Sequence, residues 1–66
     1  MEKYDLTGAI IDFENGNLTD NDIIYLFSKL IKNGMAWTLQ GFYGRTAKAL
    51  IDNGYIDNVG NILKTV

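Results

Sequence analysis

Three Asn-Gly pairs divide this chain into segments and constrain its fold more than any other feature. They are Asn15-Gly16, Asn33-Gly34 and Asn53-Gly54. Asn-Gly is common both in hairpin turns and at helix ends, because glycine accepts the left-handed backbone that each requires. The apolar residues before each pair recur at helical spacing, which favours helix ends. We therefore predict three helices, each ending at one of these pairs.

The first predicted helix covers residues 6–15. Its apolar positions at helical spacing are Leu6, Ala9, Ile10 and Phe13. Asp5 or Thr7 can cap its first turn, and Gly8 weakens it by up to ~1 kcal/mol relative to alanine.

The second predicted helix, residues 20–33, has the clearest signals. Thr19 and Asp22 form an aspartate variant of the capping box. Acidic residues lie in its first turn and lysines near its end, an order that the helix dipole stabilises by roughly 0.3–1 kcal/mol per charge. Its apolar stripe consists of Ile23, Leu26, Phe27, Leu30 and Ile31, with Ile24 and Tyr25 beside it.

The third segment predicts a turn at residues 35–37 followed by a helix over residues 38–53. One face of this helix carries Leu39, Phe42, Tyr43, Thr46, Ala47, Leu50 and Ile51. By this spacing Phe42 and Tyr43 belong to the core.

Gly41 and Gly44 fall inside this predicted helix, where each costs ~1 kcal/mol relative to alanine. Two such costs within one turn need a physical reason. Either the helix is irregular or broken near Gly41, or another backbone packs closely against the two glycines.

Residues 55–63 predict a small hairpin around residues 58–60 or an extended strap. A two-stranded hairpin is marginal by itself, so the helices or a second copy of the chain must cover Ile56 and Ile62. The expected fold class is all-α: one domain over residues 1–66, with three helices and a short extended or hairpin C-terminal tail.

A chain of 66 residues allows one domain, which buries only about 60% of the surface that its unfolded state exposes. Small domains are usually stabilised further by disulfides, a metal or self-association. There is no cysteine and no histidine, which excludes disulfides and removes the commonest metal ligand. We therefore expect a homo-oligomer without cofactor or metal. No signal peptide or membrane-length apolar run is visible, which fits a cytosolic protein.

The net charge is −2, but the charges are separated along the chain. Residues 1–22 sum to −5, whereas residues 23–51 contain four basic residues and no acid. Helix-dipole complementarity with internal neutralisation explains this pattern without any function. The alternative is an anionic face and a cationic face on the folded protein.

Catalysis has little support in the sequence. Histidine, cysteine and a phosphate-binding loop are all missing. The paired carboxylates lie beside predicted helix ends, where capping or solvation explains them. The acid-rich stretch 12–22 lacks the ligand spacing of an EF-hand loop. We expect a protein that is not an enzyme.

Binding to nucleic acid is one alternative. The second helix, the turn and the third helix resemble a helix-turn-helix in outline, and Arg45 and Lys48 lie one turn apart. The negative net charge argues against this function, because affinity for duplex DNA comes largely from neutralising phosphates.

Binding to another protein is the other alternative, because Trp37, Tyr43 and Arg45 are residue types that dominate interfaces. The predicted partner-binding residues are Trp37, Gln40, Gly41, Tyr43, Gly44, Arg45 and Lys48. In the competing structural interpretation, the Trp37 ring covers Leu30 and Leu39 in the turn. A homo-oligomer reconciles the two, because the indole can be buried against a second copy.

The stretch LIKNGMAWTLQGFYGRTAKALIDNGYI (residues 30–56) is similar to a family of very small, functionally uncharacterised bacteriophage proteins. The shared pattern is a glycine, then AW, LQG, an aromatic-containing YGR, TA, LI and a final glycine-aromatic pair. In this chain the pattern falls on Gly34, Ala36, Trp37, Leu39, Gln40, Gly41, Tyr43, Gly44, Arg45, Thr46, Ala47, Leu50, Ile51, Gly54 and Tyr55.

The resemblance implies a small phage accessory protein that acts in the host cytoplasm. Such proteins often bind host factors, including defence or gene-expression machinery. The expected function is therefore binding to a host protein in host takeover or anti-defence, with no membrane involved. A small nucleic-acid-binding regulator is the alternative.

Overall fold

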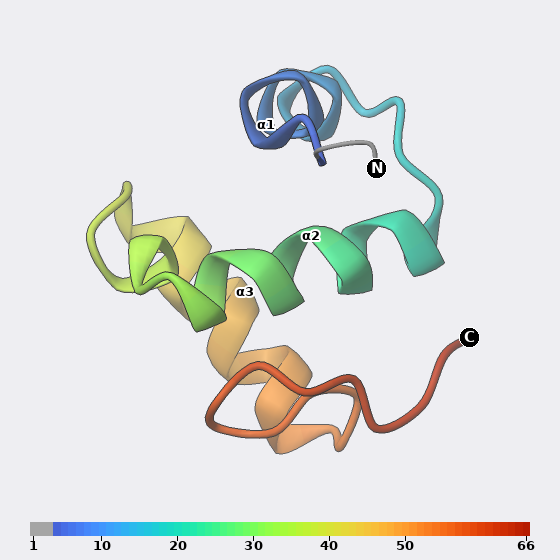
Figure 1. Ribbon diagram of the computed structural model, residues 1–66, viewed down its shortest axis with the longest axis vertical. Coiled ribbons are helices and arrows are strands. Elements are labelled where there is room, and N and C mark those ends of the chain that lie inside the picture. Colours follow the sequence, from blue (N-terminus) through green and yellow to red (C-terminus); the bar gives the residue numbers. More distant parts are fainter. Residues whose placement is uncertain (1–3) are drawn as a thin grey trace.

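The computed structural model describes residues 4–66, which form three α-helices and one turn of 3₁₀-helix (Figure 1). In chain order they are α1 (Leu6–Glu14), α2 (Asp20–Lys32), η1 (Met35–Trp37) and α3 (Gly41–Asp52). The predicted all-α, three-helix fold is confirmed, and the predicted turn at residues 35–37 is η1.

α2 is the centre of the fold, with α1 on one side and α3 and the C-terminal tail on the other (Figure 1). η1 contacts both α2 and α3. The buried apolar residues of the described chain are Ile24, Leu26, Phe27, Leu30, Ile31, Ala36, Tyr43, Ala47 and Ile56. Five of these nine come from α2, so the predicted apolar stripe of this helix is the main part of the core.

Side-chain caps set the starts of the first two helices. Asp5 Oδ1 accepts a hydrogen bond of 3.0 Å from the backbone N–H of Gly8, so Asp5 rather than Thr7 caps α1. Thr19 and Asp22 form the predicted capping box at the start of α2, with bonds of 3.2 and 3.3 Å.

Each Asn-Gly pair ends a helix, as predicted. Asn15, Asn33 and Asn53 are the C-cap residues of α1, α2 and α3. The glycine after each has a left-handed backbone, with φ of 75° at Gly16, 80° at Gly34 and 79° at Gly54. This conformation lets the cap region bond to the last carbonyls of the helix, which is why the predicted ends agree with the structure within one residue.

The predicted start of the third helix is wrong. α3 begins at Gly41 instead of residue 38, because Gln40 has an extended backbone with ψ of 153° and Thr38 closes the turn of η1. Gly41 is therefore the first helical residue, where it does not interrupt a helix interior. The break that the glycines predicted lies immediately before Gly41.

Aromatic rings join the three helices around Phe13 of α1. Its ring centroid lies 5.4 Å from that of Phe27 in α2. The rings of Phe42 and Tyr43 in α3 lie 6.1 and 5.7 Å from Phe13. Tyr43 is buried and Phe42 half-buried, which confirms their predicted place in the core. The Tyr43 hydroxyl donates a hydrogen bond of 2.6 Å to Oε2 of Glu14, so it is buried with its polar atom satisfied.

The C-terminal tail forms the predicted hairpin. Ile56 and Ile62 make an antiparallel bridge. Asp57 holds the turn between them, because its carboxylate accepts hydrogen bonds from the backbone N–H groups of Val59 and Asn61. These bonds, of which the one from the Asn61 backbone has the largest effect, hold the pKa of Asp57 below its ordinary value.

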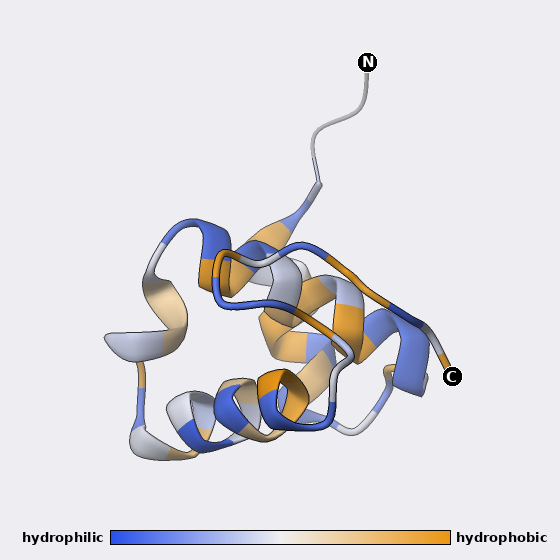
Figure 2. Ribbon diagram, turned by 90° about the horizontal axis from the view of Figure 1, so that it is seen from below, coloured by the Kyte–Doolittle hydropathy of each residue, from blue (hydrophilic) through white to orange (hydrophobic). Residues whose placement is uncertain are grey.

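The hairpin turn and the residues after it form a strap along α2, and Figure 2 shows the tail crossing the face of the molecule. The buried Ser28 hydroxyl donates a hydrogen bond of 2.5 Å to the carbonyl of Gly60. The Asn21 side chain bonds to both the carbonyl and the N–H of Val66, at 3.3 and 2.8 Å. Both contacts come from α2, so this strap is anchored at two points on the central helix.

Gly60 is the closest approach of the strap to α2. Its φ is 99°, and an added Cβ would lie 2.6 Å from Cγ of Lys32 and 2.8 Å from the Ser28 carbonyl oxygen. Only glycine fits this position, because it combines the left-handed backbone with the smallest volume.

Gly60→Ala should destabilise the domain by about 2 kcal/mol, since the new methyl overlaps α2 and the backbone conformation strains any side chain. Gly16→Ala is the matched control, because Gly16 also has a positive φ but an added Cβ there meets nothing within 4 Å. The control should cost about 1 kcal/mol. Urea unfolding measures both, and equal losses would show that the strap does not pack tightly on α2.

Tyr43→Phe should lower the free energy of unfolding by about 1 kcal/mol through the lost hydrogen bond to Glu14. Burial, followed by the hydrogen bond and charge of Glu14, raises the pKa of Tyr43 from 10.0 to about 12. Because the folded pKa is the higher one, this stabilisation is complete below the unfolded value and is lost as the pH rises through the folded value. The wild-type stability should therefore fall more steeply in this alkaline window than that of the variant. Parallel pH profiles from urea unfolding would contradict this.

Candidate functional site

The turn between α2 and α3 places Trp37 on the surface. Gly34 turns the chain with its left-handed backbone, and Asn33 Oδ1 accepts a hydrogen bond of 2.9 Å from the N–H of Met35. Ala36, the middle residue of η1, is buried with 1% of its surface exposed. Trp37 follows it and is 52% exposed.

Trp37 lies next to exposed residues of the first turns of α3. We define the indole–guanidinium patch as Trp37, Gln40, Gly41, Gly44, Arg45 and Lys48. All are exposed except Gly44, which is half-buried. Six of the seven residues predicted from the sequence are therefore accessible in the described structure.

Tyr43 is the exception and requires a correction. It is 2% exposed, and its hydroxyl is bonded to Glu14. It follows the core spacing of α3, which turns it away from the surface that Arg45 and Lys48 share. Tyr43 therefore supports the patch from within the core, and a partner cannot contact it on the folded domain.

The two glycines of α3 make room for the two large side chains of the patch. A Cβ added at Gly44 would lie 3.8 Å from Cε3 of the Trp37 indole and 3.6 Å from the carbonyl oxygen of Ala36. A Cβ added at Gly41 would lie 3.1 Å from Nη1 of Arg45. One edge of the indole thus lies against Gly44, and the guanidinium folds back over Gly41.

The exposure of Trp37 distinguishes its two interpretations, a partner-binding residue or a cover for the core. A tryptophan that closed the core over Leu30 and Leu39 would be buried, whereas more than half of Trp37 is exposed. One edge of the indole lies against Gly44, and about half of Trp37 is open to solvent. Trp37 is thus an exposed aromatic residue in a defined position.

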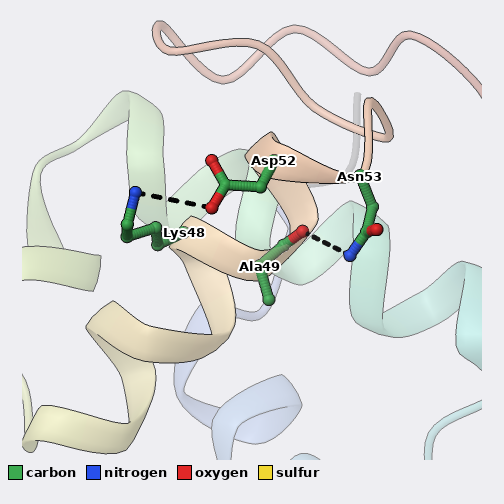
Figure 3. A network of polar contacts seen from close by, with 4 residues as sticks. All are labelled: Lys48, Ala49, Asp52 and Asn53. Carbon is green, nitrogen blue, oxygen red and sulfur yellow. Dashed lines mark hydrogen bonds and ion pairs between the residues drawn. The ribbon is translucent and has the colours of Figure 1, made fainter.

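The patch is cationic. The first turn of α3 contains no acidic residue, and Gln40 makes no side-chain capping bond. Lys48 pairs with Asp52 at 3.4 Å on the exposed surface (Figure 3), an interaction worth about 0–1 kcal/mol. This is the one ion pair within residues 4–66, so Arg45 has no acidic partner in the described part of the chain.

Sequence reasoning missed a second surface, near the first turns of α2. A groove of about 320 Å³ between α1 and α2 is lined by Tyr4, Asp5, Gly8, Ala9, Asp12, Leu18, Asp22 and Tyr25. The feature of the sequence that could have indicated this surface is the net negative charge of residues 1–22. The pattern alone did not place the carboxylates of two helices around a pair of tyrosines, because that depends on how α1 packs on α2.

The chemistry of the patch is that of recognition. The guanidinium of Arg45 carries five hydrogen-bond donors, the Gln40 amide both donates and accepts, and the indole supplies an apolar surface with one N–H donor. Within residues 4–66, no three acidic side chains gather closely enough to hold a metal ion. In the same part of the chain, no helix has the length and apolar character needed to span a membrane.

Comparison with curated proteins and with solved structures gave no significant match. A family model described as "Domain of unknown function (DUF7417)" matches residues 2–66, almost the entire chain. This agrees with the expectation of a functionally uncharacterised family. The chain therefore belongs to the DUF7417 family.

Proposed function

We propose that this chain is a small bacteriophage accessory protein that acts by binding a host protein through the indole–guanidinium patch, without catalysis. The observation that carries the proposal is the exposure of Trp37 beside Arg45, which has no acidic partner among residues 4–66, with each side chain lying against a glycine. Tryptophan and arginine are the residue types most enriched among interface residues that dominate binding energy. Neither of these two side chains is needed to fill the core.

The form of the patch also supports protein binding. The indole is braced against Gly44 and the guanidinium lies over Gly41, so both are partly ordered before a partner arrives. Ordering a side chain on binding costs roughly 0.5–1.5 kcal/mol, and a preordered residue avoids much of this cost. A patch without any acid favours a partner that presents carboxylates beside an apolar surface.

The phage context comes from the motif resemblance, whose residues divide into two groups in the structure. Ala36, Tyr43 and Ala47 are buried and hold η1 and α3 in place. Trp37 and Arg45 are exposed. One short motif thus specifies both a scaffold and an accessible surface, which suits a protein whose function is binding.

Trp37→Ala and Arg45→Ala should each weaken partner binding by about 2 kcal/mol, roughly 30-fold, because each removes a central interface side chain. Both residues are exposed, so unfolding free energies should change by no more than about 0.5 kcal/mol. The partner is first identified by affinity capture from infected host cells with mass spectrometry, and the purified partner is then titrated by calorimetry.

Leu63→Ala is the control, because Leu63 is an apolar residue with 59% exposure that lies outside the patch. It should leave the affinity unchanged. If the Trp37 or Arg45 variant instead unfolds, or if both bind like the wild type, the patch is not the binding surface.

The variant Gly41→Ala should show whether Gly41 serves the packing of the domain or the binding of the partner. Alanine at the first position of α3 does not lower helix stability, and the domain should be as stable as the wild type or slightly more so. The added Cβ meets Nη1 of Arg45 at 3.1 Å, so the guanidinium must move. Binding should therefore weaken while the melting temperature does not fall. A variant that melts earlier but binds normally would assign Gly41 to packing.

A nucleic-acid-binding regulator is the second candidate function. The observation in its favour is that Arg45 and Lys48 are both exposed and lie one turn apart on α3. Titration of fluorescent duplex DNA at low and moderate salt tests it, since phosphate contacts weaken steeply with salt. Absence of binding at low salt would eliminate this candidate.

A further inference from the structure

The groove between α1 and α2 is acidic. Asp5, Asp12 and Asp22 line it, and none of its lining residues is a lysine or an arginine. Its volume of about 320 Å³ is large enough for a side chain from outside. The groove thus suits a cationic group that is attached to an apolar one.

Two tyrosines complete the groove. The rings of Tyr4 and Tyr25 pack edge to face with 4.9 Å between centroids, and they are 39% and 43% exposed. Nζ of Lys29 lies over the Tyr25 ring at 5.1 Å, at the border of the groove, so this ring already attracts a cation. Aromatic rings and carboxylates together favour arginine, which stacks on the former and forms two hydrogen bonds to the latter.

Asp12 is the groove carboxylate that accepts no hydrogen bond from the described residues. Asp5 and Asp22 each accept a backbone N–H at a helix start. The exposed Asp12 side chain has no hydrogen bond or ion pair with the described residues. It is the natural position for a new charge-assisted bond.

The same chain carries the complementary surface. The indole–guanidinium patch contains Arg45, which has no acidic partner in the described residues, and an exposed tryptophan beside it. The residues that line the groove include the first turns of α2, and the patch begins after its last turn. A helix of thirteen residues is roughly 20 Å long, so the two surfaces cannot meet within one molecule.

We propose that the chain associates head to tail with a second copy of itself, with the indole–guanidinium patch of one copy docked in the acidic groove of the next. Arg45 of one copy pairs with Asp12 of the other, and Trp37 packs against the groove tyrosines. The charge separation along the sequence is the electrostatic basis of this contact. Each copy uses its patch on one neighbour and its groove on another, so the contact is heterologous and extends into chains or closes into a ring.

This inference shares the patch with the proposed function and adds a means of regulation. A second copy and a host protein compete for Trp37 and Arg45, so self-association masks the patch at high protein concentration. Dilution, or a partner of higher affinity, exposes it. Variants of the groove should therefore affect self-association and leave direct binding of the host protein unchanged.

Sedimentation velocity up to millimolar concentration tests the proposal. At low salt the mean mass of the wild type should rise past that of a dimer, and it should return towards the monomer at high salt because charge attraction is screened. Asp12→Lys and Arg45→Ala should each weaken association at least tenfold, while circular dichroism shows unchanged helices. Asp20→Lys is the control, since it makes the same charge change on α2 outside the groove and should still associate.

Mixing the two disabled variants gives the sharpest result. Asp12→Lys keeps an intact patch and Arg45→Ala keeps an intact groove, so the mixture should stop at a one-to-one heterodimer. Association that survives Asp12→Lys would overturn the proposal, because the contact would then use another surface. A wild type that stays monomeric at low salt would also overturn it. If the wild type stayed monomeric and Trp37→Ala still abolished host-protein binding, the proposed function would hold without self-association.

Discussion

Burial of the apolar surface of α2 from two sides is the interaction on which this structure depends. Leu26, Phe27 and Leu30 have no exposed surface, and burying such a side chain contributes about 1.5–3 kcal/mol. α1 has no fully buried residue, and α3 has only Tyr43 and Ala47. The outer elements are therefore held in place mainly by covering α2, which replaces the disulfide or metal that small domains often use.

The position of the patch follows from the same arrangement. η1 joins the end of α2 to α3, and its buried Ala36 occupies the core while the adjacent Trp37 does not. Gly44 and Gly41 then give the indole and the guanidinium room along α3. A rigid core thus sets the place of exposed side chains that contribute little to stability, and this separation lets a small domain change its surface without losing its fold.

Only folding determines where the acidic and basic residues lie relative to one another. Asp5 caps α1 and Asp22 completes the capping box of α2, and both line a groove together with Asp12 and two tyrosines. Of the cations that follow, Lys29 and Lys32 lie in the last turn of α2, and Arg45 lies on α3 with no acidic partner among the described residues. Dipole complementarity therefore explains Asp5 and Asp22, but it does not explain Asp12 or Arg45.

Local rules in the sequence determined the helices and their ends. The Asn-Gly pairs located three C-termini within one residue, and Thr19 with Asp22 located the start of α2, because caps depend on a few neighbouring backbone groups. Tertiary packing decided what local rules do not contain. It started α3 at Gly41, paired the Tyr43 hydroxyl with Glu14, required glycine at position 60 beside Ser28 and left Trp37 exposed. Each of these depends on atoms that are distant in the chain or on the path of the turn between two helices, and residue spacing carries no information about such distances.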